Sequence, residues 1–348
     1  MRAMAVVDYD APLVGIEVEE PVLRDGDALL DIVTCGVCFS DVKTSRGHMP
    51  YSASLSLPHV PGHEIFGIVR RTEPRGLLDE GTRAVVYHYR PCGRCAACRR
   101  GDETLCSRMV AWTGFTDAGG FTERIAVPVD RLVPIPDVVD AIHAAPMSCA
   151  LGTAYRSVVT RGEVRAGTTA VVLGLGGVGI HAAQIARASG ARTVGFDVDE
   201  RTLAAARDLQ LDARRSDDDD DVDDLVASTH GDGVDVVVDT VGADATLALA
   251  RRLARPGGRV VGVGYSPTTS LTVPTPSFVL DEVVYLGSRY AHRDDLMHAV
   301  SLVERGIVRP VIGMVRPLED VNDVFVSLEA GDVMGRAVLE IQEQEQAS

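Results

Sequence analysis

Three side chains within residues 34–41 could take part in chemistry: the thiol of Cys38, the hydroxyl of Ser40 and the carboxylate of Asp41. A thiolate can bind a metal, a hydroxyl can carry a proton, and a carboxylate can orient a neighbouring ligand. A buried cysteine is more often a small apolar residue of a core. The segment therefore predicts a metal site only if further ligands occur elsewhere in the chain.

Two further ligands follow along the chain. His63 stands beside Glu64 in the sequence Pro-Gly-His-Glu, and Cys149 lies within residues 145–155. Two thiolates and one imidazole leave a tetrahedral Zn²⁺ with an open fourth position, which is the arrangement of catalytic zinc. We therefore predict that Cys38, His63 and Cys149 bind a catalytic metal.

A second cluster has the spacing C-x2-C-x2-C-x7-C and consists of Cys92, Cys95, Cys98 and Cys106. Four thiolates so close together can close a tetrahedral cage around Zn²⁺, and a closed cage is structural rather than catalytic. Iron–sulfur ligation can also begin with C-x2-C-x2-C, but the seven-residue gap and the lack of a following proline weigh against it. The sequence predicts a structural zinc lobe at about residues 91–107.

A glycine-rich turn matches G-x-G-x-x-G directly after a short apolar strand and directly before a helix; it consists of Gly174, Leu175, Gly176, Gly177, Val178 and Gly179. Gly174 permits a tight turn, Gly176 lets the backbone approach a pyrophosphate, and Gly179 allows close helix packing. The phosphates would lie against the helix N-terminus, whose N–H groups favour anions. The turn predicts a dinucleotide site.

Asp197 lies 18 residues after Gly179, at the end of the next predicted strand. A carboxylate there can bond both ribose hydroxyls of NAD, and it would repel the 2′-phosphate of NADP. Val198 and Asp199 supply no compensating cation, and Arg201 is the one nearby cation that would weaken the argument. NAD is therefore predicted over NADP.

The elements that must position these residues differ between the two parts of the chain. Residues 14–19 and 28–33 read as strands, with Pro, Gly and Asp clusters between further short strands. Later, helices alternate with short apolar strands at residues 171–173, 193–196, 234–238, 259–263 and 283–286. This βαβ rhythm predicts an α/β fold with a doubly wound parallel sheet at residues 150–286. Residues 1–149 and 287–348 would form a β-rich domain.

Composition excludes several classes of function. A hydrophobic content of 46% with 24% charged residues is typical of a soluble globular protein, and the net charge of -16 argues against a nucleic-acid or anionic membrane surface. With no N-terminal apolar segment, we expect a cytoplasmic protein whose cysteines act as thiolate ligands, with Cys35 as a packing residue. The acidic residues 217–224 are interpreted as a solvated surface loop with the start of a helix.

Together these motifs resemble the medium-chain, zinc-dependent alcohol dehydrogenase family. The family pattern G-x-C-x-[ST]-D is met by residues 36–41 and G-H-E by residues 62–64, and the four-cysteine lobe and glycine turn match as well. The similarity runs from the first strands to residues 335–337. It implies a GroES-like catalytic domain, a Rossmann domain that binds NAD, and one catalytic and one structural Zn²⁺ per chain.

The resemblance also implies roles for single residues. Asp41 would accept a hydrogen bond from His63, and Glu64 would lie behind the metal. Ser40 would carry the proton of the alcohol outward through the ribose of the nicotinamide. Lys43 stands where many members have a histidine that ends this relay, so its amine, if its pKa is lowered, or a water molecule would end it.

Further residues match positions that contact the cofactor or distinguish branches of the family. Arg336 matches the arginine that reaches the cofactor pyrophosphate, and Val261 and Val263 lie along the strand end where the nicotinamide would bind. Phe39 stands where members commonly carry a histidine or arginine that contacts a cofactor phosphate. Cys149 favours the alcohol branch, because polyol dehydrogenases tend to carry a carboxylate there.

The predicted function is the interconversion of an alcohol and an aldehyde or ketone by hydride transfer to or from NAD. Dehydrogenation of a polyol, a sugar or a CoA-linked hydroxyl stays open, while the retained metal ligands disfavour a zinc-free, NADPH-dependent enone reductase. A zinc ribbon that binds nucleic acid is disfavoured by the acidic balance. The expected partners are a small-molecule substrate and copies of the same chain in a homodimer or homotetramer, because the resemblance implies that residues 284–289 could pair edge strands across a dimer. No nucleic acid or membrane partner is expected.

Overall fold

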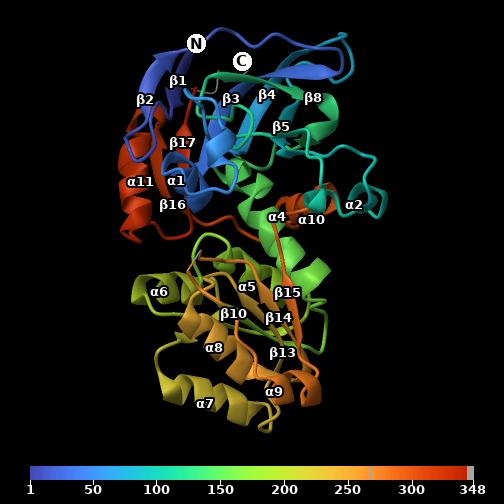
Figure 1. Cartoon of the computed structure of the whole chain (residues 1–348), viewed down its shortest axis with the longest axis vertical. Helices are drawn as coiled ribbons and strands as arrows, with labels where there is room; N and C mark the ends of the chain where they lie inside the picture. Colours follow the sequence, from blue (N-terminus) through green and yellow to red (C-terminus); the bar gives the residue numbers. More distant parts are fainter. Residues whose placement is uncertain (267, 343–348) are drawn as a thin grey trace. The chain divides into compact units, whose positions relative to one another are not determined.

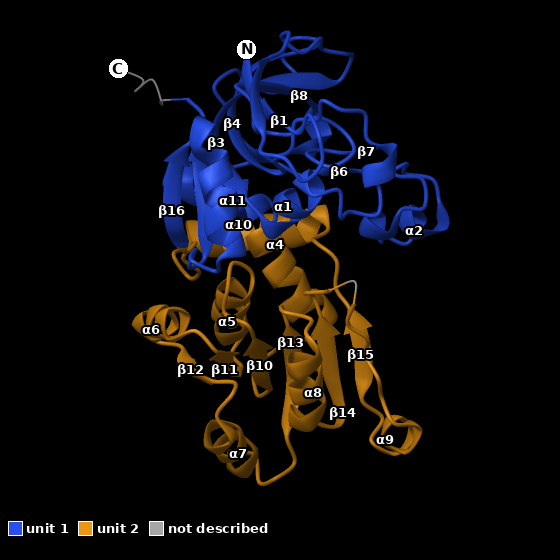
Figure 2. Cartoon of the chain, turned by 60° about the vertical axis from the view of Figure 1, so that its left-hand side comes forward, with its two compact units in different colours: residues 1–149, 312–348 blue, residues 150–311 orange. Residues whose placement is uncertain are grey.

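The computed structural model describes residues 1–266 and 268–342 (Figure 1). The chain divides into two compact units: unit 1 is Met1–Cys149 with the chain from Ile312 onward, and unit 2 is Ala150–Val311 (Figure 2). The first boundary coincides with the one expected from the sequence, whereas the chain returns to unit 1 at Ile312 and not at residue 287. The reason is that α10 (Arg293–Glu304) packs against α4 (Ala150–Tyr155) within unit 2.

Unit 1 is built around β3 (Asp27–Val37), which pairs antiparallel with β4 (Glu64–Thr72), β8 (Arg124–Pro128) and β17 (Arg336–Glu340). Almost every residue of β3 is buried, because the strand is covered on both faces. The sheet is completed by β5 (Arg83–Val86), β9 (Leu132–Pro134) and β16 (Ile312–Pro317). β3 ends directly before Cys38, so the central strand of the unit delivers the first predicted metal ligand.

Smaller elements surround this sheet. They are β1 (Arg2–Ala5), β2 (Val14–Glu17), β6 (Tyr89–Arg90), β7 (Ala111–Trp112), α1 (Phe39–Ser45), α2 (Ala96–Arg99), α3 (Ala141–Ala144) and α11 (Val321–Glu329). The core of the unit includes Leu30, Ile32, Ile65 and Phe121, and Cys35 lies fully buried among them. Cys35 therefore takes the packing role expected of it.

Unit 2 contains a six-stranded parallel sheet in the order β12-β11-β10-β13-β14-β15. Its strands are β10 (Thr169–Leu173), β11 (Arg192–Asp197), β12 (Asp212–Arg215), β13 (Val234–Asp239), β14 (Ala254–Gly262) and β15 (Val284–Gly287). Its further helices are α5 (Gly179–Ala188), α6 (Glu200–Asp208), α7 (Asp219–Ser228), α8 (Asp244–Leu253) and α9 (Thr275–Leu280). The strand order reverses at β10, between β11 and β13, and ligands of such sheets bind at the carboxyl ends of the strands at this switch point.

The central strands β10 and β13 are short and mostly apolar, because both faces of a parallel sheet are covered. Val171, Val237 and Val260 are buried in one core with residues of α7 and α8. The predicted doubly wound sheet is confirmed, with one omission. β12 has the sequence Asp-Ala-Arg-Arg, which carries no apolar pattern, so it was not expected as a strand.

The acidic residues 217–224 open α7, whose first turn carries Asp219 and Asp220 and whose N-cap is Asp218. Arg252 of α8 forms ion pairs with Asp219 and Asp223. The run is therefore a solvated helix start, as interpreted from the sequence, that is also tied to a neighbouring helix. Within the described ranges no helix is long and apolar enough to cross a lipid bilayer.

Candidate functional site

The predicted ligands of the catalytic metal lie together in unit 1. The ligand atoms of Cys38, His63, Glu64 and Cys149 all lie within 4.8 Å of one another, and all four residues are buried. Cys38 follows β3 and His63 precedes β4. Because β3 and β4 are antiparallel neighbours, the end of one strand lies beside the start of the other. Cys149 joins them from the turn that precedes α4.

Asp41 orients two groups of this cluster. Its Oδ1 accepts a hydrogen bond from His63 Nδ1 over 2.9 Å, and its Oδ2 accepts one from the N–H of Cys38 over 2.8 Å. With Nδ1 held by the carboxylate, Nε2 is the ring nitrogen that would bind a metal. Burial lowers the pKa of His63, but the charge of Asp41 and the hydrogen bond to it raise the pKa to about 10.

The donor set of the cluster fits a tetrahedral zinc ion. Zinc binds thiolate sulfur at about 2.3 Å and imidazole nitrogen at about 2.0 Å, so ligand atoms around one ion lie about 3.5–3.8 Å apart. Two thiols already interact in the cluster: a hydrogen bond to Cys149 lowers the pKa of Cys38 well below its usual value, against the effect of burial. The same contact raises the pKa of Cys149. A lowered pKa favours the thiolate form of Cys38, which is the form that binds a metal.

Glu64 and Arg336 form a buried ion pair behind this cluster. Arg336 Nη2 lies 3.0 Å from Glu64 Oε1, and their side chains are 7% and 0% exposed. Burial raises the pKa of Glu64 to about 7, and the charge of Arg336 acts in the opposite direction. Gly36, opposite Glu64 in the pairing of β3 and β4, leaves room for the carboxylate, since a Cβ there would overlap it. Glu64 and Arg336 both belong to motifs of the sequence, but nothing in those motifs predicted that the two side chains are in contact.

Ser40 and Lys43 lie on α1, which begins directly after Cys38. Residues three apart lie on one face of a helix, so Ser40 and Lys43 share a face of α1. Burial lowers the pKa of Lys43, whereas the charge of the Cys38 thiolate acts to raise it. The Lys43 amine lies 5.9 Å from the centre of the Phe39 ring.

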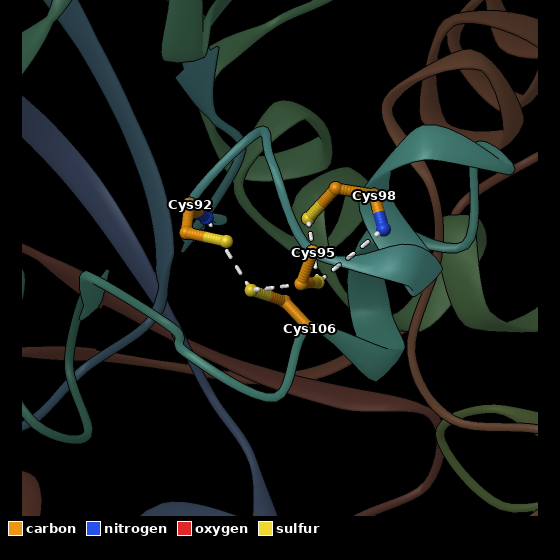
Figure 3. Close-up of side chains that lie close together, drawn as sticks. All are labelled: Cys92, Cys95, Cys98 and Cys106. Carbon is orange, nitrogen blue, oxygen red and sulfur yellow. Dashed lines mark hydrogen bonds between the residues drawn. The ribbon is translucent and has the colours of Figure 1, made fainter.

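The second cysteine cluster lies at the start of α2, where the four side chains come close together (Figure 3). The sulfur atoms of Cys92, Cys95, Cys98 and Cys106 all lie within 4.8 Å of one another. Cys95 Sγ lies 3.4 Å from Cys98 Sγ and 3.9 Å from Cys106 Sγ, close to the ~3.8 Å that a tetrahedral zinc–thiolate cage requires. Backbone N–H groups, that of Cys98 first, lower the pKa of Cys95 to about 5. The cluster fits a closed zinc cage.

The glycine-rich turn of unit 2 connects β10 to α5 at the switch point of the sheet. Gly174 has φ +80°, and a Cβ at Gly179 would overlap the carbonyl oxygen of Gly174. By contrast, apart from Gly176 itself and its two neighbours in the chain, no described residue has an atom within 4 Å of the Cβ position of Gly176. Gly174 therefore makes the turn, Gly179 lets α5 approach it, and Gly176 presents open backbone to a ligand. Gly177 and Val178 complete the turn, and Val178 is the N-cap of α5.

Asp197 ends β11 beside this turn. Its Oδ2 accepts a hydrogen bond from the N–H of Leu175 over 2.6 Å, and its Oδ1 accepts bonds from Val198 and Asp199 over 2.8 and 3.0 Å. These backbone bonds hold the carboxylate at the carboxyl end of the sheet, where an adenosine ribose would lie. Arg201, in the first turn of α6, forms an ion pair with Asp199 at 2.8 Å.

Two valines of the predicted nicotinamide site differ in accessibility. Val261 is fully buried inside β14, whereas Val263 follows the strand, is partly exposed and donates its N–H to the Asp239 carbonyl over 2.8 Å. A ligand at this edge of the sheet would therefore meet Val263 and the main chain and not the side chain of Val261.

Comparison with known proteins decides the family. The protein-family model described as "Alcohol dehydrogenase GroES-like domain" matches residues 24–137. A second family model, described as "Zinc-binding dehydrogenase", matches residues 177–305. An alcohol dehydrogenase of Geobacillus stearothermophilus is 34% identical over 98% of this chain and 100% of its own length. The chain belongs to the zinc-dependent, medium-chain alcohol dehydrogenase family. The resemblance inferred from the motifs is confirmed, as is the combination of a GroES-like and a Rossmann-type domain.

Solved structures of the family share the whole fold. A structure described as an NAD-dependent alcohol dehydrogenase superposes with a TM-score of 0.91 at 28% identity, covering 98% of this chain and 100% of that one. The alcohol dehydrogenase of the hyperthermophilic archaeon Aeropyrum pernix gives a TM-score of 0.89 at 29% identity, with coverage of 98% and 100%.

Proposed function

We propose that this chain is a zinc-containing dehydrogenase that interconverts an alcohol and an aldehyde or ketone by hydride transfer to or from NAD. The main support for this proposal is the buried group of two cysteines and one histidine, whose imidazole is oriented by Asp41. Such a donor set leaves one position of a zinc ion open to a substrate oxygen. The alcohol dehydrogenases that this chain resembles over its whole length support the same reaction.

We assign the catalytic zinc to Cys38, His63 and Cys149. When bound, the zinc would act as a Lewis acid that favours ionisation of the alcohol, and NAD would accept the hydride. Asp41 keeps the imidazole in one orientation and one tautomer. The structural zinc is assigned to the four cysteines Cys92, Cys95, Cys98 and Cys106.

Three residues of unit 1 would serve the reaction without binding the metal at rest. Ser40 would take the alcohol proton, and Lys43, whose pKa burial lowers, or a water molecule would receive it next. Glu64 lies in the ligand cluster, so it could approach the metal during ligand exchange.

The cofactor site would be formed by the open backbone at Gly176, the N-terminus of α5 and the carboxylate of Asp197. The pyrophosphate would lie against the N–H groups of the turn and Asp197 would bond the ribose. Val263 would line the nicotinamide end of the sheet.

A homo-oligomer is the assembly that the surface of unit 2 favours. β15 is the last strand of its sheet, and the neighbouring helix α9 exposes Phe278, Val279 and Leu280. An open strand edge beside exposed apolar side chains is typical of association between chains. We also infer a cytoplasmic location, because a reducing compartment preserves the seven thiols.

Metal analysis and turnover test the proposal together. The purified protein is expected to contain two zinc ions per chain and to form NADH when screened against primary, secondary, aromatic and polyhydroxy alcohols. Cys149→Ala should remove one zinc and abolish NADH formation, while the zinc of the four-cysteine lobe stays bound. Loss of one zinc with full activity retained would overturn the assignment.

A further inference from the structure

A second arginine, which the sequence did not indicate, lies near the end of β11. β12 lies beside β11 at this side of unit 2 (Figure 2), and Arg215 is the cross-strand neighbour of Asp197. The N–H of Ser216 donates to the Asp197 carbonyl over 3.0 Å, which fixes the two strand ends together. Arg215 is thus a second cation, besides Arg201, next to the carboxylate that would bond the cofactor ribose.

Both guanidinium groups are held by an aspartate two residues away. Arg201 directs Nε and Nη2 to the carboxylate of Asp199 at 2.8–3.2 Å. Arg215 directs Nε and Nη2 to the two oxygens of Asp217 at 2.9 and 2.7 Å. In each pair the fork of the guanidinium faces a carboxylate, which is the same geometry with which arginine binds a phosphate.

We propose that Asp199 and Asp217 determine cofactor specificity together with Asp197. Each aspartate holds the guanidinium of its neighbouring arginine, so neither Arg201 nor Arg215 is available to neutralise the 2′-phosphate of NADP. This inference rests on the proposed function, because it assumes that the ribose of a dinucleotide lies at the end of β11.

The physical basis is a competition between two anions for one guanidinium. Both pairs are partly exposed, with Arg201 62% and Arg215 40% exposed, so water and salt weaken them and they contribute little to folding. The negative charge of each aspartate also repels a phosphate. Neutralising one aspartate would therefore remove a repulsion and release a cation, without loss of a buried contact.

Binding measurements on the whole protein test the proposal. In an Asp197→Asn background, Asp217→Asn is expected to tighten binding of NADP⁺ and of adenosine 2′,5′-bisphosphate about tenfold, measured by titration calorimetry. Asp199→Asn, which keeps an oxygen that can cap α6, should act in the same way. The control is Asp212→Asn, which releases Arg214 from an equivalent pair. Since Arg214 and Arg215 are adjacent in a strand, they project to opposite faces, and the control should change affinity little.

Repeating the measurement with Arg215→Ala present distinguishes two effects of Asp217→Asn: release of Arg215, and loss of the repulsion between Asp217 and the phosphate. With Arg215→Ala present, Asp217→Asn can only remove the repulsion, because no guanidinium is left to be released. The gain in affinity should therefore be smaller than the gain expected with Arg215 present. An equal gain with and without Arg215, or a gain no larger than that of the Asp212→Asn control, would overturn the proposal.

The wild-type protein separates this inference from the proposed function. Wild-type protein that binds neither NAD⁺ nor NADP⁺ would refute the proposed function itself. Wild-type protein that binds NAD⁺, combined with unchanged affinities in the aspartate variants, would refute only the role of Asp199 and Asp217.

Discussion

Asp41→Asn should weaken the catalytic zinc site while leaving the fold intact. Asp41 is fully buried and accepts two hydrogen bonds, one from His63 Nδ1 and one from the N–H of Cys38. Asparagine has one oxygen and one NH₂ group in place of the two oxygens. One of the two donors would therefore face another donor and lose its acceptor.

The size of the effect follows from these contacts. Leaving one buried donor unsatisfied costs about 1–3 kcal/mol. Loss of the carboxylate that orients a metal-bound histidine typically costs about 10- to 100-fold in metal affinity, which corresponds to about 1.4–2.7 kcal/mol. The two estimates agree, so we expect about 10- to 100-fold weaker binding of one zinc ion per chain.

Competition with a chromogenic chelator measures this change, because the zinc in the four-cysteine lobe serves as an internal reference. Asp31→Asn is the matched control: Asp31 also lies in unit 1, but its carboxylate pairs with Arg70 and Arg124 at the surface. Such exposed pairs are worth about 0.2–1 kcal/mol, and this variant should keep both zinc ions. Zinc release from Asp41→Asn that matches the wild-type curve would refute the orienting role of Asp41.

Two further predictions concern the cofactor turn and the buried ion pair. Gly179→Ala places a methyl group against a backbone carbonyl and should abolish NAD binding. Gly176→Ala fills open space, so it should weaken NAD binding with little loss of thermal stability. Equal melting temperatures for the two variants would contradict this distinction. Arg336→Ala leaves Glu64 as a buried, unpaired carboxylate and should lower the free energy of unfolding by about 3–5 kcal/mol, as measured by denaturant titration. Adding Glu64→Gln should restore part of that loss, and no recovery in the double variant would argue against the ion pair.

Part of the site could be predicted because it is local in the chain. The four cysteines from Cys92 to Cys106 lie within one loop, so their spacing alone restricts how far apart the sulfur atoms can be. The same holds for the glycine turn, in which the positive φ of Gly174 and the close approach at Gly179 depend on backbone only a few residues long.

Other features required the paired strands. β12 was not expected, because its sequence has two arginines and an aspartate and no apolar pattern, and it is recognised as a strand only through its pairing with β11. The return of the chain to unit 1 was expected at residue 287, but α10 packs on α4 and keeps the chain in unit 2 up to Val311.

The sequence by itself determined the family of this protein, the residue types of its candidate metal ligands and the glycine turn. These follow from residue types and short spacings, which need no knowledge of distant contacts. Only the tertiary structure decided which distant residues meet, namely Glu64 with Arg336, and Asp197 with Arg215. Such neighbours depend on the register between strands, and register is set by the packing of the whole sheet and not by any one segment.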